Sequence, residues 1–199
     1  MPAFPQKNGI LPAKQDKRKY EKASVRRYRK EDYFYRNKHS LSLLFYANFA
    51  TKMKLYPMNN LTTLLHQGNY SCVIRQRSEV RTFTSRGISD LFRLYRDEPE
   101  FLRGAWMADK VVGKGAAALM VLGGIATVHA DIISSPALRM LRNADIDVRF
   151  DTEVPYICNR QGTGWCPVEA LCRDLSTPDE MLPRITSFVD KALREAATE

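Results

Sequence analysis

The stretch that most constrains the fold is residues 104–124, GAWMADKVVGKGAAALMVLGG, where small residues, charges and continuous apolar surface follow one another. We interpret it as the end of a strand, a turn, and a buried helix over about 111–122 that a glycine pair closes. The turn would carry Asp109, Lys110 and Lys114 at or near the helix N-terminus. Free backbone N–H groups and the helix dipole favour anionic ligands there. The turn is therefore the first candidate site.

The rest of the chain alternates strand and helix patterns. Period-2 alternation predicts strands, and apolar residues at helical spacing predict helices that begin near prolines or polar capping residues. The expected elements are a hairpin of strands 71–77 and 79–85, a helix over 87–97, strands over 101–107, 127–134 and 147–154, a helix from Pro136, a helix from Pro167 and a last helix from Pro178 to Ala192.

This order predicts an α/β fold class. Strands and helices that alternate after a hairpin indicate a three-layer α/β/α sandwich with an N-terminal β-hairpin and a mixed sheet of about five strands. The parallel part of the sheet should have right-handed crossovers, so helices should cover both of its faces.

The charge of the chain is concentrated at its start. Residues 1–57 hold fourteen Lys and Arg against four Asp and Glu, a net charge of +10, so residues 58–199 sum to −1 of the total +9. We expect two parts: a basic tail over 1–57 and a nearly neutral domain over 58–199. The tail is open to three interpretations: an RNA-binding arm, a disordered segment, or a segment absent from the native protein if Met58 is the physiological start.

Cysteines and hydropathy indicate the compartment. The four cysteines, at 72, 158, 166 and 172, have none of the two-residue gaps of a zinc knuckle or a redox pair. No run approaches the roughly 18 apolar residues of a membrane span. We therefore expect a reduced, cytoplasmic protein without membrane contact, and the sequence leaves a homo-oligomer open.

The turn ADKVVGKGAAA partly follows the phosphate-binding pattern G-x-x-x-x-G-K-[ST]. Ala108 occupies the first glycine position and Gly115 the position of the magnesium-binding hydroxyl, which argues against nucleotide hydrolysis. What remains is a helix start with lysines beside it and Asp109 as a cap or base. The alternative is that Asp109 only caps the helix while Lys110 and Lys114 are solvated.

A second constellation is CNRQGTGWCPVE at 158–169. Cys166 precedes a helix start, where the dipole favours the thiolate, so it is a candidate nucleophile, and Glu169 could serve as acid or base. No histidine can be paired with Cys166 from the sequence, and a small capping role is the alternative. Asn159 and Arg160 suit contacts to an anion or amide, or else brace the loop.

These three motifs, GAWMADKVVGKGAAALMVLGG, ADIISSPALRML and NRQGTGWCPVE, together resemble a family of uncharacterised bacterial domains with a cytidine-deaminase-like fold. The resemblance covers about residues 66–172 and implies the same α/β/α architecture. It does not imply deamination, because the H-x-E and P-C-x-x-C arrangements of the zinc deaminases are absent. At the helix starts where the resemblance places zinc ligands stand Gly87, and Asp109 with Lys110. We therefore expect neither a metal nor another cofactor.

The leading functional hypothesis is a deaminase-like domain without the zinc motifs that binds a small anionic or nucleotide-like ligand. The first alternative is a metal-independent enzyme with Cys166 as nucleophile and Asp109 or Glu169 as base. The second is an RNA-associated protein that acts through the tail. The candidate catalytic residues are Cys166, Asp109 and Glu169, and the candidate ligand-binding residues are Lys110, Lys114, Asn159 and Arg160.

Overall fold

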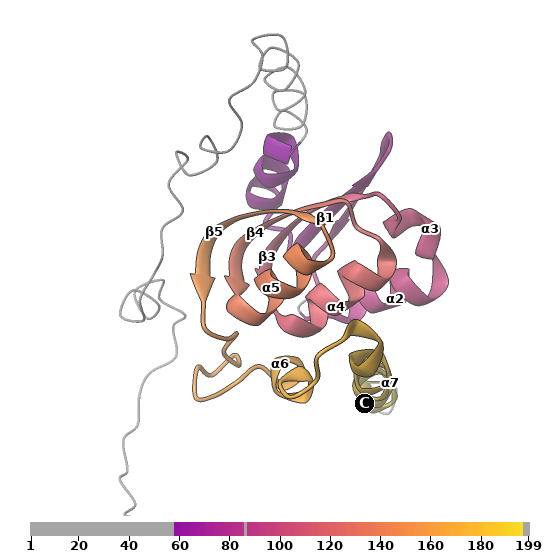
Figure 1. Ribbon diagram of the computed structural model, residues 1–199. Helices are drawn as coiled ribbons and strands as arrows, with labels where there is room; N and C mark the ends of the chain where they lie inside the picture. The colour runs from indigo at the N-terminus through magenta and orange to yellow at the C-terminus, as the bar shows by residue number, and fades with distance from the viewer. Residues whose placement is uncertain (1–57, 86, 197–199) are drawn as a thin grey trace, which may run out of the picture.

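The computed structural model describes residues 58–85 and 87–196, which are built around a five-stranded mixed sheet of order β2-β1-β3-β4-β5 (Figure 1). Strand β1 is antiparallel to β2 and β3, whereas β3, β4 and β5 are parallel. The predicted α/β class, the leading hairpin and the five strands are confirmed, and the basic tail lies outside the described residues. The strands are β1 (Cys72–Gln76), β2 (Glu79–Phe83), β3 (Trp106–Val112), β4 (Thr127–Ser134) and β5 (Asp147–Val154).

Helices cover both faces of the sheet, as a three-layer sandwich requires. A helix over 58–67, hereafter the N-terminal helix, covers one face; α2, α4 and α5 cover the other, and α6 and α7 pack outside α4 (Figure 1). No helix in this part of the chain is long and apolar enough to span a membrane. The named helices are α2 (Ser89–Asp97), α3 (Pro99–Leu102), α4 (Lys114–Gly123), α5 (Ser135–Asn143), α6 (Pro167–Cys172) and α7 (Pro178–Ala196).

Helix α4 is the centre of the larger core. Ala117, Ala118, Leu119 and Met120 are all fully buried, because the helix lies between the sheet on one side and α6 and α7 on the other. A helix that is apolar all round needs such cover. The predicted closing glycine is confirmed: Gly124 adopts the left-handed conformation with φ 69°, and its N–H donates to carbonyls of the last helical turn.

The opposite face has a smaller apolar cluster that the sequence analysis did not predict. Met58, Leu61 and Leu65 of the N-terminal helix pack on Val73 and Ala108 of the sheet. The spacing of three and four residues places the three helical side chains on one stripe. This stripe fixes the N-terminal helix across β1 and β3.

The predicted boundary between strand and helix in the organising stretch is wrong. The sequence predicts a strand over 101–107, then a turn and a helix from about residue 111, but the structure has α3 at Pro99–Leu102, continues β3 to Val112 and begins α4 at Lys114. Asp109 and Lys110 are consequently strand residues, not members of a turn at a helix N-terminus.

Strand pairing explains why the polar pair stays in the sheet. Strand β3 is central, and Asp109 has a register partner on each side, Cys72 of β1 and Ala130 of β4. Pairing on both sides satisfies backbone groups that a turn would leave to water, and tertiary context here overrides the local polar signal.

Candidate functional site

The N-terminus of α4 is closed by a carboxylate from elsewhere in the chain. Gly113 is the N-cap residue, with extended backbone, and the first helical N–H, of Lys114, donates to Glu169 Oε2 at 2.6 Å. Glu169 belongs to α6, 55 residues further on. A negative group at a helix N-terminus is stabilised by the dipole and by the free N–H groups.

Glycine at position 113 is what allows this approach. A Cβ there would lie 2.5 Å from Glu169 Oε2 and 3.2 Å from the Cγ1 atom of Ile157. Any side chain would therefore displace the carboxylate from the helix start.

The second oxygen of Glu169 has no partner. The residue is 2% exposed, and Oε1 is buried without a hydrogen bond. A buried acceptor left unsatisfied costs roughly 1–3 kcal/mol, so native proteins seldom retain one without a water or ligand donor beside it. Glu169 thus combines a fixed oxygen and a free one at the start of a ten-residue helix.

Lys114 contributes its backbone here but not its side chain. Its Nζ donates to the carbonyl oxygens of Arg173 at 2.9 Å and Leu175 at 2.6 Å, just after α6. These bonds satisfy carbonyls at a helix C-terminus and hold α6 against α4. The ammonium is therefore already used, which argues against its predicted contact with an anion.

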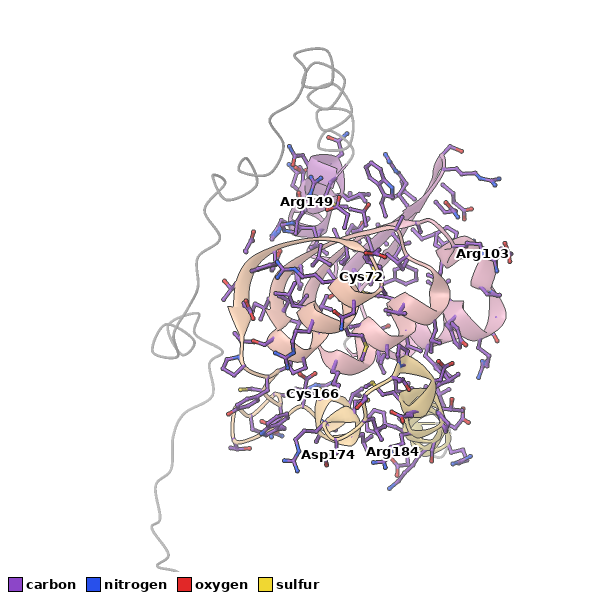
Figure 2. All side chains as sticks on the ribbon, in the orientation of Figure 1. Cys72, Arg103, Arg149, Cys166, Asp174 and Arg184 are labelled. Atoms are coloured by element: carbon purple, nitrogen blue, oxygen red, sulfur yellow. The ribbon has the colours of Figure 1, made fainter. Side chains whose placement is uncertain are left out.

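Cys166 lies at the N-cap position of α6, and its side chain makes no capping hydrogen bond. Its backbone N–H donates to the carbonyl of Ile157 at 2.7 Å. Burial raises the pKa of the nearby Cys172 thiol to about 11, opposed by Lys114 and assisted by Glu169. Figure 2 shows Cys166 on the side of the molecule where α6 lies.

Asn159 braces its own loop. Its Oδ1 accepts from the N–H of Thr163 at 2.9 Å, and its Nδ2 donates to the Thr163 hydroxyl at 3.1 Å. Its backbone N–H donates to the carbonyl of Gly164 at 2.8 Å. Tyr156 and Trp165 stack across the base of the loop with ring centroids 4.5 Å apart. The bracing interpretation of Asn159 fits these bonds, whereas Arg160 is exposed.

Asp109 is half-buried in β3, and its Oδ1 accepts from the N–H of Val111 at 2.8 Å. Burial raises its pKa from 3.8 to about 7; the charge of Asp131 adds to this, and hydrogen bonds from Val111 and Cys72 oppose it. The Cys72 thiol is itself buried, and burial, then Asp109 and Asp90, raise its pKa. Cys72 and Asp109 are register partners in the paired strands β1 and β3.

Lys110 does not join Asp109. Side chains alternate along a strand, and Lys110 Nζ donates at 2.8 Å to Oδ1 of Asn69, which follows the N-terminal helix. Lys110 therefore lies on the face opposite to α4.

Residues 60–189 match a family model described as a domain of unknown function, DUF1893. The chain belongs to the DUF1893 family. The membership in an uncharacterised domain family that the motifs predict is thereby confirmed.

A solved DUF1893 structure has a similar fold. The crystal structure of a DUF1893 family protein (TM1506) from Thermotoga maritima matches with a TM-score of 0.61 and 22% sequence identity, covering 65% of this chain and 88% of that chain. No curated protein matches the chain. At this identity the likeness shows the fold, and the chemistry of this DUF1893 domain must be argued from its own side chains.

The predicted site residues thus divide into groups. Glu169 and the backbone of Lys114 meet at the start of α4; Asp109 lies in the sheet beside Cys72, and Lys110 lies on the other face. No functional role was predicted for Gly113 or Cys72. The Gly-Lys pair before an alanine run is a sequence signal for Gly113 at a helix start. The position of Cys72 beside Asp109 depends on strand register, which no local pattern predicts.

Proposed function

We propose that this DUF1893 domain binds a small ligand at the N-terminus of α4, and that the free oxygen of Glu169 accepts a hydrogen bond from it. The observation that carries the proposal is that the two oxygens of Glu169 differ in hydrogen bonding. Oε2 accepts from the Lys114 N–H, while Oε1 is buried without a partner. An oxygen fixed in that way is already oriented for a donor.

The chemistry of the site favours a ligand with adjacent donor and acceptor groups. An ionised carboxylate only accepts, so the ligand must supply an N–H or O–H. The next N–H groups of the first turn, of Gly115 and Ala116, have no acceptor within the helix and favour an acceptor on the same ligand. A nucleobase edge has this combination. Because Glu169 takes the place of an anion at the helix start, the nucleotide-like part of the sequence prediction is favoured over a free anion.

The deaminase-like resemblance supports the same location. Gly115 lies close to the start of α2, since a Cβ on it would be 3.5 Å from Ile88 Cδ1, so the two helix starts are neighbours. The residues at these starts are Ile88 with Ser89 and Gly113 with Lys114, and none of them is a usual zinc ligand. We infer a deaminase-like ligand site that works without zinc.

The two alternatives from the sequence stay predictions. For Cys166 as nucleophile, the described residues supply no hydrogen bond to the thiol, and α6 has only six residues. RNA binding by the tail concerns residues outside the described part of the chain.

A thermal-shift experiment on the full-length chain tests the proposal. The probes are uridine, cytidine, adenosine and guanosine, with inorganic phosphate as an anion. A nucleoside that binds should raise the melting temperature in proportion to RT ln(1 + [L]/Kd), by several degrees at about 100 times Kd.

The deciding variant is Glu169→Gln. Its carbonyl can still accept from Lys114, but an NH₂ group then stands where the free oxygen was, so a ligand donor meets a donor. We expect the nucleoside shift to disappear while the variant remains folded. Glu100→Gln, which changes an exposed carboxylate, is the matched control and should keep the shift. A nucleoside shift that Glu169→Gln retains would refute the proposal.

A further inference from the structure

A second cluster of ligating side chains lies on the face of the sheet that carries the N-terminal helix. His129 and Asp131 are two residues apart on β4, so they point to the same face. The pairing of Ala130 with Phe150 places Asp151 of β5 beside Asp131. The N-terminal helix supplies His66 from above.

The face is fixed by the neighbours of His129 in the sheet. Its register partners are Ala108 of β3, which packs under the N-terminal helix, and Arg149 of β5. Figure 2 shows Arg149 beneath that helix, far from Cys166 and α6. The cluster is therefore separate from the Glu169 site.

The distances between these side chains match those of metal ligands. His66 Nε2 lies 3.1 Å from Asp131 Oδ1, and His129 Nε2 lies 3.9 Å from that oxygen and 3.6 Å from Asp151 Oδ1. One ligand atom from each of His129, Asp131 and Asp151 lies within 4.8 Å of the others. Bonds of about 2.0–2.1 Å in tetrahedral geometry place ligand atoms roughly 3.3–3.4 Å apart. The observed separations lie on both sides of that value, so small side-chain rotations would suffice.

Two of the four side chains are largely shielded from solvent, and the other two are exposed. The side chains of His129 and Asp131 are 16% and 22% exposed, whereas those of His66 and Asp151 are 52% and 63% exposed. His66, His129 and Asp151 border a hollow of about 390 Å³, which gives an ion access from solvent and room for a further ligand. The residues that line the hollow are Thr62, Thr63, His66, Gln67, His129 and Asp151.

The charges of the site suit a dication. Two carboxylates balance a charge of +2, and within the described residues Asp131 and Asp151 form ion pairs only with histidines. The neighbouring Arg149 places its Nη2 3.4 Å from Asp147 Oδ2, and its Nη1 is buried without a hydrogen-bond partner among the described residues. Imidazole nitrogen with carboxylate oxygen is a donor set for zinc and similar transition metals, not for calcium or magnesium.

We propose that His66, His129, Asp131 and Asp151 bind a divalent transition-metal ion of the zinc class. The proposal is independent of the function proposed for Glu169, because the two sites are on opposite faces of the sheet. Four protein ligands would make a closed structural site; if the half-exposed His66 side chain rotates away, three protein ligands and a water would remain.

The test uses the full-length chain, stripped with a chelator and then titrated with Zn²⁺ and Co²⁺. We expect one equivalent to bind, a higher melting temperature, and the visible absorption of tetrahedral Co²⁺ without a thiolate charge-transfer band. Asp131→Asn should weaken binding at least about 100-fold, since even second-shell changes cost 10–100-fold. Asp174→Asn, which alters an exposed carboxylate far along the chain, is the control and should bind as the parent does.

His66→Gln keeps the test decisive if the strand variants fold poorly, because its side chain is half-exposed on a helix. It should weaken binding about 10-fold or more while the apo melting temperature stays unchanged. A thiolate band would assign the metal to cysteines and overturn the proposal. So would binding that both Asp131→Asn and His66→Gln leave intact, or no stoichiometric binding.

Discussion

Polar side chains on the two faces of the sheet differ in their burial and in how they are grouped. On the face of α4, Glu169 is 2% exposed and anchored to a helix start, and Asp109 lies half-buried beside a thiol. On the face of the N-terminal helix, Asp151 and His66 are largely exposed and border an open hollow. One face isolates single carboxyl groups in a packed interior, whereas the other gathers several groups near solvent.

The difference separates the two proposed sites by the ligand that each would take. A buried acceptor with one free oxygen would favour a neutral donor of defined shape, because a charged ligand would lose its hydration on entry. A half-exposed set of imidazoles and carboxylates would favour a cation, because each group can rotate towards a common centre. Substitutions on the α4 face test whether its polar groups are tightly packed, and substitutions at exposed positions test whether the surface groups are solvated.

The largest effect is expected for Gly113→Ala. The added Cβ would lie 2.5 Å from Glu169 Oε2 and 3.2 Å from Ile157, so the carboxylate must leave the helix start. Overpacking and the lost hydrogen bond together should lower the free energy of unfolding by roughly 3 kcal/mol. Chemical denaturation of both proteins measures this loss.

Gly164→Ala is the matched control for that change. Its added Cβ would meet only Asn159 Nδ2, at 3.8 Å, which is an ordinary contact. We expect a change below about 0.5 kcal/mol. If Gly113→Ala were equally mild, the approach of Glu169 to α4 would not be as close as described.

The second effect concerns Asp109. Its pKa is raised from 3.8 to about 7 mainly by burial, so between about pH 4 and pH 7 the unfolded chain loses the proton first and stability falls as pH rises. Asp109→Asn removes this penalty and retains an acceptor for the Val111 N–H. The shift corresponds to at most about 4 kcal/mol, and partial exposure of the side chain reduces the expected gain at pH 8 to roughly 1–2 kcal/mol.

Melting temperatures of Asp109→Asn and the parent from pH 4.5 to pH 8 check this prediction. The variant should gain relative to the parent as pH rises and show little advantage at the acid end. Asp174→Asn, at an exposed position, should show no such trend. A constant difference across the range would mean that Asp109 is as well solvated as Asp174.

A smaller effect is expected for Lys114→Met. The ammonium donates to the carbonyls of Arg173 and Leu175, and methionine fills the same space without those bonds. The loss should be about 1 kcal/mol, because water can reach part of the freed carbonyl groups. Hydrogen exchange should quicken in α6 while β4 and β5 stay protected.

The smallest effect is expected for Arg160→Ala. Arg160 is exposed in a loop that Asn159 braces, so unfolding should change by less than about 0.5 kcal/mol. Binding of the nucleosides should also be unchanged. A clear loss of nucleoside binding would mean that Arg160 contacts the ligand and that the ligand site reaches beyond the N-terminus of α4.

Local signals predicted much of the fold. Strands β4 and β5 have the expected bounds, Thr127–Ser134 and Asp147–Val154, because a glycine pair, a proline and a short turn separate the patterns. The β3 to α4 boundary was misplaced since Asp109 and Lys110 imitate a turn. Cys72 and Asn69, which hydrogen-bond these two side chains, lie some 40 residues earlier in the chain.

The sites depend still more on distant pairing. Glu169 was a candidate from its place near Cys166, but its partner, the Lys114 N–H, is 55 residues away. His129 and Asp131 look like ordinary strand residues, and only strand register and the N-terminal helix bring Asp151 and His66 to them. The sequence located the helix starts that a proline marks, at Pro167 and Pro178, whereas clusters across strands depend on the fold.

One titration tests the central claim that the two faces carry independent sites. Amide ¹H–¹⁵N spectra of the full-length chain are recorded with Zn²⁺ and, separately, with the nucleosides. The account predicts that Zn²⁺ shifts the amides around His66, His129 and Asp151, while a nucleoside shifts those of Lys114, Gly115 and Glu169. Shifts of one common set of amides by both probes, or nucleoside shifts confined to residues away from α4, would contradict it.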